Sequence, residues 1–299
     1  MAPSVLIIGA SGSVGEPLVK EFLRQRSHFG RVAILSEPSK AHKFNAIQNN
    51  GIELVLGSFL DFKCYQGFDV VISLAGNTFQ RLQPAMIEAA VAGGVRHFYP
   101  SEFGIDFDRD DVQQFRFFRD RIVTRDHLAA TAKAHPDFRY TLMVVGQFSQ
   151  WAYSKVCGID VENHVAEAYG YPDAEISVTA LEDIVRYTVE SILLPFPPGK
   201  SRRDICVRGD HVTWKQLIAL LEEVQGVKYQ VTYIDPQEAA EKQEAARQRG
   251  DESEELKWAA RWQVGPSGRV TVTGPLDNDK FGFTPETLKE TMQRLLKAN

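Results

Sequence analysis

The chain has 299 residues, of which 43% are hydrophobic and 24% are charged, and its formal net charge at pH 7 is −5. These values are typical of a soluble globular protein with a substantial core, and without a basic block they argue against nucleic acid as the main partner. No run approaches the roughly 18 apolar residues of a membrane span, and the first residues show no signal-peptide pattern, so we expect a cytoplasmic protein without a membrane partner.

The first half of the chain alternates apolar runs with helical patterns. The runs lack strict polar–apolar alternation, which is typical of strands in a parallel sheet that is buried on both faces. Right-handed connections through the intervening helices then predict an α/β fold with a doubly wound, Rossmann-like parallel sheet. The expected strands are residues 4–8, 31–36, 52–58, 69–76, 96–104 and 139–148, and the expected helices include 15–25, 39–50, 85–94 and the arginine-rich segment after residue 117.

This rhythm weakens after about Trp151. The later helical patterns cover residues 178–194 and 213–226, with short strands near 204–209 and 229–234. Residues 236–262 contain few large apolar side chains and predict one or two exposed helices broken near Gly250. We therefore expect a dinucleotide-binding domain over residues 1–152, with some later segments packing back on it, and a smaller α/β substrate domain over residues 153–299.

Three glycines lie between the first strand and the first helix. Gly9, Gly12 and Gly15 in "LIIGASGSVG" follow the pattern G-x-x-G-x-x-G. Glycine lets the backbone turn tightly and approach a pyrophosphate, to which the helix N-terminus presents free N–H groups. The pattern favours dinucleotide binding over a purely structural turn.

The end of the second strand leaves the choice of dinucleotide open. An NAD site needs an acidic residue there, whereas an NADP site needs a cation. The segment offers Ser36 and Glu37, followed by Lys40 and Lys43. Glu37 could bind a ribose hydroxyl and either lysine a 2′-phosphate, and a solvated loop of mixed charge fits equally well.

Several familiar catalytic motifs are missing from the chain. None of the nine tyrosines is followed four residues later by a lysine, so the Tyr–Lys pair of typical short-chain dehydrogenases is absent. A nucleophile elbow and an H-E-x-x-H motif are absent as well. The three cysteines, Cys64, Cys157 and Cys206, are widely spaced and odd in number, which predicts a reducing compartment and neither disulfides nor a metal site.

Several motifs along most of the chain point to one known family. They are the glycine loop, "VVIS", "QPAMIEAAVAGGVRHFYPSEFG", "PSEFGIDFDR", "YTLMVVGQF", "ALEDIVRYTVESIL" and "FGFTPETLKETM". Together they are similar to the isoflavone reductase-like, NmrA-like branch of the atypical short-chain dehydrogenases, which includes phenylcoumaran benzylic ether and pinoresinol–lariciresinol reductases of plants and many fungal relatives. The resemblance implies an NADP-binding Rossmann-like domain, a smaller C-terminal substrate domain and NADPH-dependent reduction.

The chain departs from this family at two positions. In the family's reductases the helix after "PSEFG" carries a catalytic lysine, followed by two variable residues, an aliphatic residue and an arginine. Aligning that arginine with Arg125 puts Arg121 at the lysine position and Thr124 at the aliphatic one. Arginine has a pKa above about 12 and cannot cycle a proton near pH 7, but it can fix a carboxylate, carbonyl or enolate oxygen by bidentate hydrogen bonds. The second departure is Ser36, where NADP-binding relatives commonly have an arginine.

Helical geometry gives a separate view of Arg121. Spacings of four and seven residues predict a buried stripe of Phe118, Ile122 and Ala129, with Arg125 near its centre and Arg121 at its margin. An arginine at that margin could pair with Glu102 or Asp106, could position a ligand, or could be solvated. Since arginines four residues apart repel each other, we expect at least one to have an anionic partner.

The remaining candidates come from the C-terminal ends of the strands, where ligands bind in such sheets. Phe148, Trp151 and Tyr153 could line an aromatic pocket or pack between domains, and His164 could be an acid or base or a structural residue. The candidate catalytic residues are Arg121 and His164. The candidate substrate contacts are Phe103, Gly104, Arg125, Trp151 and Tyr153. The candidate cofactor contacts are Gly9, Ser11, Gly12, Val14, Gly15, Ser36, Lys40, Lys43, Ser73, Ala75 and Phe148.

Three functions follow from this combination of features. The first is an NADPH-dependent reductase of a small aromatic or polyketide-like metabolite, in which NADP(H) is favoured over NAD(H). The others are a regulatory NmrA-like protein that senses a dinucleotide without turnover, and a non-redox enzyme that dehydrates, isomerises or cyclises its substrate. We expect a monomer or a homodimer.

Overall fold

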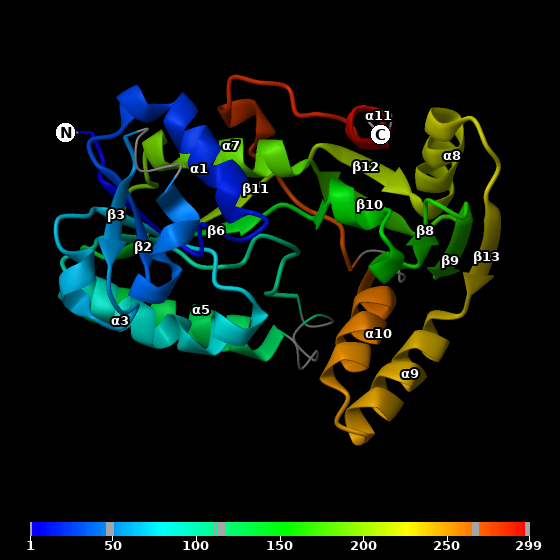
Figure 1. Ribbon diagram of the computed structural model, residues 1–299, viewed down its shortest axis with the longest axis horizontal. Helices are drawn as coiled ribbons and strands as arrows, with labels where there is room; N and C mark the ends of the chain where they lie inside the picture. The colour runs from blue at the N-terminus through cyan, green and yellow to red at the C-terminus, as the bar shows by residue number, and fades with distance from the viewer. Residues whose placement is uncertain (1, 46–50, 110–111, 113–117, 265–268, 297–299) are drawn as a thin grey trace. The chain divides into compact units, whose positions relative to one another are not determined.

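The computed structural model describes residues 2–45, 51–109, 112, 118–264 and 269–296 (Figure 1). The chain divides into two compact units. Unit 1 comprises Met1–Glu102, Arg119–Met143 and Val185–Ile205, and unit 2 comprises Phe103–Phe118, Val144–Ile184 and Cys206–Asn299. Unit 2 is as large as unit 1, because Phe103–Phe118 and Val144–Ala152 group with the later residues. The later segment that groups with unit 1 is Val185–Ile205.

A seven-stranded sheet with the order β11-β6-β5-β4-β1-β2-β3 forms the centre of unit 1. The pairings β3–β2, β2–β1, β1–β4, β4–β5 and β5–β6 are all parallel. Every residue of β1, β2 and β4 is buried, as expected for strands covered on both faces. This strand order is that of a Rossmann fold, in which the order of successive strands along the sheet reverses between β1 and β4. The predicted fold class is therefore confirmed. The strands are β1 (Val5–Ile8), β2 (Val32–Ser36), β3 (Glu53–Leu56), β4 (Val70–Ser73), β5 (His97–Tyr99), β6 (Arg139–Val144) and β11 (Arg202–Cys206).

The predicted helices of this half are present, with one difference. The segment after β2 forms a 3₁₀ helix, η2 (Pro38–Phe44), in which Pro38 occupies the start, and the rest of the helix expected over 39–50 lies outside the described residues. The other helices are α1 (Gly15–Arg24), η1 (Arg26–His28), η3 (Phe62–Tyr65), η4 (Asn77–Leu82), α3 (Gln83–Ala92), α5 (Arg119–Ala134) and α7 (Leu181–Leu193).

The apolar run expected as one strand over residues 139–148 is interrupted at Gly146. Gly146 has φ +70°, and a Cβ atom there would lie 2.4 Å from the carbonyl oxygen of Ser177. Only glycine fits this close approach without strain. β6 therefore ends at Val144, and Gln147–Phe148 forms a separate strand, β7, which pairs with β10 (Glu175–Thr179) in a different sheet.

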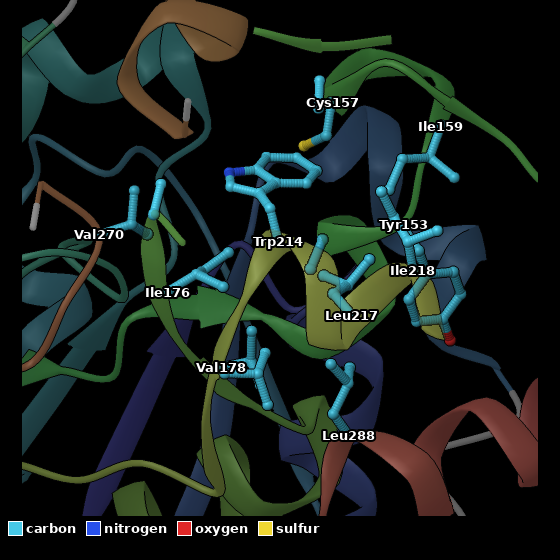
Figure 2. Packing of buried hydrophobic residues seen from close by; sticks show 14 of the residues in the cluster. Tyr153, Cys157, Ile159, Ile176, Val178, Trp214, Leu217, Ile218, Val270 and Leu288 are labelled. Carbon is cyan, nitrogen blue, oxygen red and sulfur yellow. The ribbon is translucent and has the colours of Figure 1, made fainter. Parts of the chain in front are cut away.

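Unit 2 contains two three-stranded sheets, with the orders β12-β10-β7 and β13-β9-β8. Trp214 is 1% exposed and packs among apolar side chains from β10, α8 and α11 (Figure 2). Of the one or two helices expected over residues 236–262, the structure has two, α9 and α10, which are separated at Gly250. The elements are α6 (Ser149–Ala152), η6 (Lys155–Cys157), β8 (Ile159–Asp160), β9 (Val165–Tyr169), β12 (Asp210–Thr213), α8 (Trp214–Gln225), β13 (Gln230–Ile234), α9 (Pro236–Gln248), α10 (Glu252–Val264), η7 (Asn278–Lys280) and α11 (Leu288–Leu296).

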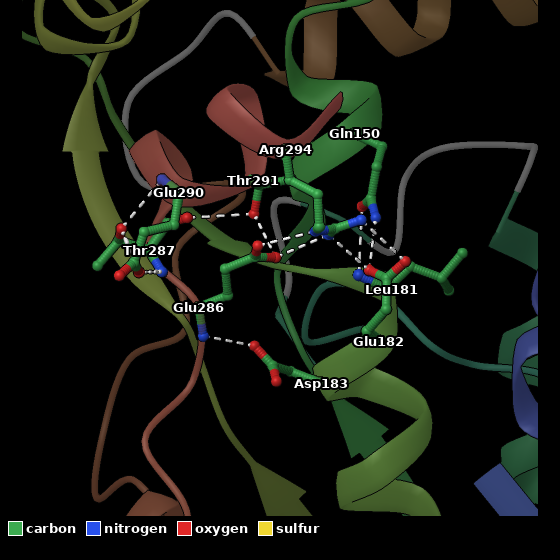
Figure 3. Close-up of polar contacts among 9 residues, drawn as sticks. All are labelled: Gln150, Leu181, Glu182, Asp183, Glu286, Thr287, Glu290, Thr291 and Arg294. Carbon is green, nitrogen blue, oxygen red and sulfur yellow. Dashed lines mark hydrogen bonds and ion pairs between the residues drawn. The ribbon is translucent and has the colours of Figure 1, made fainter. Parts of the chain in front are cut away.

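Ion pairs attach the last helix to the rest of unit 2. Arg294 on α11 pairs with Glu182 at 2.9 Å and with Glu286 at 2.7 Å, and Glu182 also accepts a hydrogen bond from Gln150 (Figure 3). The amide of Glu286 donates to the carboxylate of Asp183 at 2.6 Å, which ties the segment before α11 to the start of α7. Within the described residues, no helix is long and apolar enough to cross a membrane.

Candidate functional site

The glycine loop joins the C-terminal end of β1 to the start of α1, and β1 lies beside β4 in the sheet. Gly9 has φ +84°, and a Cβ atom there would lie 2.6 Å from the carbonyl oxygen of Leu74. A Cβ atom at Gly15 would lie 2.4 Å from the carbonyl oxygen of Gly9, whereas one at Gly12 would lie 3.4 Å from that oxygen. A side chain at Gly9 or Gly15 would clash with the backbone, so the fold of the loop requires glycine at both positions. The lack of a side chain at Gly12 leaves the outer face of the loop open.

The outer face of this loop presents backbone N–H groups. Ser11, Gly12 and Ser13 are exposed, and the amide of Gly12 bonds back to Gly9 at 3.1 Å. Within the described residues, the amides of Ser11, Ser13 and Val14 donate no backbone hydrogen bond. Helix α1 begins at Gly15 without a side-chain cap, so its N-terminal dipole also faces this loop. Such an arrangement suits an anion, such as a pyrophosphate.

The residues after β2 already interact with one another. The Ser36 side chain is buried and its hydroxyl donates to the carbonyl of Glu37 at 3.1 Å. Lys40 pairs with the Glu37 carboxylate at 2.6 Å and lies 5.5 Å from the centre of the Phe79 ring. Lys43 is exposed on η2. The acidic group that could bind a ribose hydroxyl is thus engaged by a lysine, and a second lysine stands nearby in sequence.

The end of β4 is tied to the "PSEFG" loop by hydrogen bonds that the sequence did not reveal. The carbonyl of Ala75 accepts from the Gln80 side chain at 2.9 Å and from the Ser101 hydroxyl at 2.9 Å. The Gln83 side chain in turn accepts from the Ser101 amide at 2.8 Å. Ser73 is fully buried, and its hydroxyl has no hydrogen-bond partner among the described residues. No sequence pattern points to Gln80 and Gln83, because their side chains bond to backbone groups of other segments, and any residue type can supply a backbone group.

A buried ion pair joins the same loop to α5. Glu102 and Arg125 have side chains only 1% and 8% exposed, and the Nε atom of Arg125 donates to Oε2 of Glu102 at 2.7 Å. The second oxygen of Glu102, Oε1, is buried without a hydrogen-bond partner in the described structure. Burial raises the pKa of Glu102 to about 7, although the positive charges of Arg125, Arg121 and Arg202 oppose the shift.

Arg121 lies one turn before Arg125 on α5. Its guanidinium is largely desolvated, and this burial lowers its pKa, whereas the charges of Glu102 and Asp120 raise it. The residue that pairs directly with Glu102 is Arg125 and not Arg121. Arg121 therefore contributes to the charge balance around Glu102 without bonding to it.

The predicted buried stripe of α5 was partly wrong. Arg125 is buried as predicted, but Ala129 is exposed, and Phe118 and Ile122 are half-buried. The buried positions are Thr124, Arg125, Leu128 and Ala132. The buried stripe therefore follows the spacing Thr124–Leu128–Ala132 and not Phe118–Ile122–Ala129.

The candidate aromatic residues belong to unit 2. The Phe148 and Trp151 rings stack with centroids 4.7 Å apart, and Trp151 remains 49% exposed. Tyr153 is buried, and its hydroxyl has no hydrogen-bond partner among the described residues. Burial raises the pKa of Tyr153 to about 12, with Glu286 and Glu182 adding to the shift and Arg294 opposing it. Gly104 forms an isolated parallel bridge with Val144, and Phe103 precedes it in the half-buried loop.

His164 occupies a turn between β8 and β9. Its φ is +55°, a left-handed conformation, and its ring lies edge-on to Tyr229 with centroids 5.5 Å apart. Its carbonyl accepts from the Gln230 amide at 2.8 Å. These contacts are those of a residue that shapes a hairpin.

The structure thus gathers the candidates into two groups. Unit 1 holds the glycine loop, Ser36, Lys40, Lys43, Ser73, Ala75, Arg121 and Arg125, and unit 2 holds Phe103, Gly104, Phe148, Trp151, Tyr153 and His164.

Comparison with known proteins gives consistent matches along the chain. The NmrA-like family model matches residues 1–257. An isoflavone reductase homologue from Zea mays is 27% identical over 252 residues, covering 80% of this chain and 79% of that protein. A crystal structure of an isoflavone reductase superposes with a TM-score of 0.80 at 19% identity, covering 98% of this chain and 99% of the other. The leucoanthocyanidin reductase–NADPH complex from Vitis vinifera superposes with a TM-score of 0.76 at 18% identity, covering 97% and 98% of the two chains.

Proposed function

The chain belongs to the NmrA-like family, and from this premise we propose that it is an NADPH-dependent reductase of a small aromatic or polyketide-like metabolite. The observation that carries the proposal is the glycine loop at the switch point between β1 and β4. Its first and third glycines are sterically required, and its exposed amides suit a pyrophosphate. The Zea mays relative is named as an isoflavone reductase homologue, which supports reductive chemistry.

The chain's own residues fit a dinucleotide in unit 1. Ser11, Ser13 and Val14 would donate backbone hydrogen bonds to the pyrophosphate, assisted by the N-terminal dipole of α1, and Gly12 would let the ligand approach the loop closely. Ser73 and Ala75, at the end of β4, would border the site, since ligands bind at the carboxyl ends of these strands. When bound, the nicotinamide supplies a hydride to the substrate.

Two lysines support NADPH over NADH. The carboxylate of Glu37 is held by Lys40 at 2.6 Å, so it is less available to a ribose hydroxyl. Lys43 is exposed and would meet the 2′-phosphate in place of the arginine that relatives have at Ser36. Loss of a charge-assisted hydrogen bond costs about 1.5–3 kcal/mol. We therefore expect Lys43→Ala to raise the Kd for NADPH at least about tenfold and to leave that for NADH unchanged.

The matched control for this measurement is Lys20→Ala. Lys20 is an exposed lysine on α1 that pairs only with Glu16 among the described ion pairs. An equal loss of affinity for both nucleotides on Lys43→Ala would contradict a phosphate contact, and so would a loss of NADPH affinity on Lys20→Ala.

Arg121 takes the position of the family's lysine but a different role. Its guanidinium stays protonated, so it would hold a substrate carbonyl or enolate oxygen by paired hydrogen bonds while the proton comes from water. Arg125 cannot share this role through its Nε atom, because that atom is committed to Glu102. The Glu102–Arg125 pair would instead fix the loop and α5 around Arg121.

The same replacement favours a second function. A protein that binds the dinucleotide without turnover needs no proton-transferring lysine, so a regulatory sensor accounts for Arg121 as well. One experiment separates the two functions. NADPH and NADH binding is measured by calorimetry, and oxidation of the bound cofactor is then followed with a panel of aromatic ketones and quinone methides.

The proposed reductase binds NADPH and oxidises it with at least one member of the panel. Tight NADPH binding without turnover across the panel would contradict the reductase and support the sensor. If neither nucleotide binds, both functions are ruled out, and a non-redox enzyme on the same fold is left.

Arg121→Lys tests the proposed role of the side chain. Lysine keeps the charge but loses the planar pair of donors, so kcat/KM should fall about tenfold or more. The matched control is Arg119→Lys on the same helix, where the side chain is 72% exposed and pairs with its neighbour Asp120. Unchanged kinetics for Arg121→Lys would show that Arg121 does not contact the substrate.

A further inference from the structure

Strand β13 forms an open edge of the β8–β9–β13 sheet in unit 2 (Figure 1). It pairs in parallel with β9 over Gln230–Ile234, and the other side of β9 is occupied by β8. The strand is regular over all five residues, so its free side is a continuous row of backbone groups.

The backbone groups of this free edge can be assigned to residues. The Gln230 amide donates to the carbonyl of His164, which places Gln230 on the β9 side. Because amides alternate along a strand, Thr232 and Ile234 also face β9, and Val231 and Tyr233 face outward. Within the described residues, no other segment hydrogen-bonds to the backbone of Val231 or Tyr233.

Nothing in the sequence of β13 protects this edge. Proteins usually guard exposed edges with lysine, proline or a bulge, because an open edge otherwise recruits another strand. The five residues QVTYI contain no charge, proline or glycine. Tyr233 is 38% exposed and Thr232 is exposed as well.

We propose that β13 pairs antiparallel with β13 of a second copy of this chain and forms a homodimer with a continuous six-stranded sheet. A two-fold axis through Thr232 pairs Val231 of each copy with Tyr233 of the other. These are the two residues whose N–H and C=O groups face outward, so the pairing makes four hydrogen bonds between the copies. It also places a β-branched side chain opposite an aromatic one, which is a favourable cross-strand pair.

Charge at the ends of the strand selects a second copy in antiparallel orientation. Lys228, which pairs with Glu222, precedes β13 with a side chain that is 87% exposed, and Asp235, whose carboxylate caps α9, follows the strand. Antiparallel pairing brings Lys228 of one copy close to Asp235 of the other at both ends of the interface. A parallel arrangement would place like charges together, which is unfavourable.

The first test is the oligomeric state of the full chain in solution. Sedimentation velocity from 1 to about 500 µM should show a concentration-dependent dimer. Tyr233→Lys places a charge on the outward edge and should weaken the dimer at least about tenfold. The matched control is Leu256→Lys on α10, a residue of similar exposure at 39%, which should leave the Kd of the dimer unchanged.

The second test fixes the register by cross-linking. Thr232 meets its own copy in a non-hydrogen-bonded pair with Cα atoms about 4.5 Å apart, within the range of a disulfide. Thr232→Cys should therefore form a covalent dimer on mild oxidation. Gln230→Cys is the control, because the two cysteines would be about 14 Å apart along the strands at about 3.4 Å per residue. The native chain, which has three cysteines of its own, serves as the blank.

Two results would overturn the proposal. One is a monomer at every concentration. The other is a dimer that Tyr233→Lys does not weaken and that Thr232→Cys does not cross-link. Neither result depends on nucleotide binding, so they are independent of the proposed reductase activity.

Discussion

The buried pair of Glu102 and Arg125 leads to a prediction about Arg125→Met. Methionine keeps most of the apolar length of arginine but removes the charge beside a carboxyl group that is 1% exposed. At pH 8 the carboxyl of Glu102 in the native chain, with a pKa of about 7, is ionised, so the loss of its partner leaves a buried group that must either keep an uncompensated charge or take up a proton. Breaking such a pair with the charge kept costs about 3–5 kcal/mol, and proton uptake lowers that cost. At pH 5 the carboxyl is neutral, and only a hydrogen bond worth about 1–2 kcal/mol is lost.

The pH dependence follows from the direction of the shift. A carboxyl whose pKa is raised in the folded state binds more protons folded than unfolded between pH 4.5 and 7, so the free energy of unfolding falls as the pH rises through that window. Without Arg125 the pKa of Glu102 rises further and the fall continues above pH 7. The added slope acts over the one pH unit from 7 to 8, so the Arg125→Met variant should lose up to about 1.4 kcal/mol more at pH 8 than at pH 5.

The assay is urea denaturation at pH 5 and pH 8, followed by far-UV circular dichroism. Tryptophan fluorescence is unsuitable, because Trp151, Trp214, Trp258 and Trp262 all belong to unit 2, whereas the ion pair lies in unit 1. Glu102→Gln combined with Arg125→Met is the control, since a neutral amide removes the titrating group and should equalise the losses at the two pH values. An equal loss for Arg125→Met itself at pH 5 and pH 8 would refute the reasoning.

Three further predictions concern unit 1. Gly15→Ala should abolish NADPH binding in calorimetry, because its Cβ atom would lie 2.4 Å from the Gly9 carbonyl oxygen, whereas Gly12→Ala, at 3.4 Å, should still give a folded protein. Arg203→Met should lower the free energy of unfolding by about 2–4 kcal/mol in urea denaturation, since buried Arg203 donates to the Tyr99 hydroxyl and to the carbonyls of Ser191, in the last turn of α7, and Leu194, just after it. His97→Gln should reduce the acid sensitivity of the fold. Burial, with Arg203 and Arg139 nearby, lowers the pKa of His97 to about 3, so native stability is lost as the pH falls from 6.5 towards 3, by at most about 1.4 kcal/mol per pH unit for this half-buried ring. Equal slopes for the variant and the native chain between pH 6.5 and 4 would contradict this assignment.

The central sheet was predictable because its signals are local. Each apolar run forms a strand, and the glycine loop appears where a parallel sheet requires a tight turn. The exception is the run over residues 139–148. The pattern of apolar residues in this run gives no sign that it forms two strands, β6 and β7. Its break depends on the close approach of Gly146 to Ser177, a contact between segments about thirty residues apart in the chain.

The candidate site was predictable only for groups that act through their own backbone. The glycine loop has a sequence pattern because its geometry is local. No sequence pattern identifies the partner of Glu102, because Arg121 and Arg125 are the same residue type and lie one helical turn apart. Which of them reaches the carboxylate depends on how α5 is rotated, and that rotation is set by tertiary packing.

The division of the chain into units has a consequence for how this protein can be altered. The chain passes between the two units five times. A fragment that ends at residue 152 would therefore lack β11 and all of α7, and β6 would have no neighbour on that side of the large sheet. Recombination at one splice point cannot transplant either unit, so exchange of unit 2 between relatives requires three matched segments at once, and changes in specificity are more accessible by point substitution.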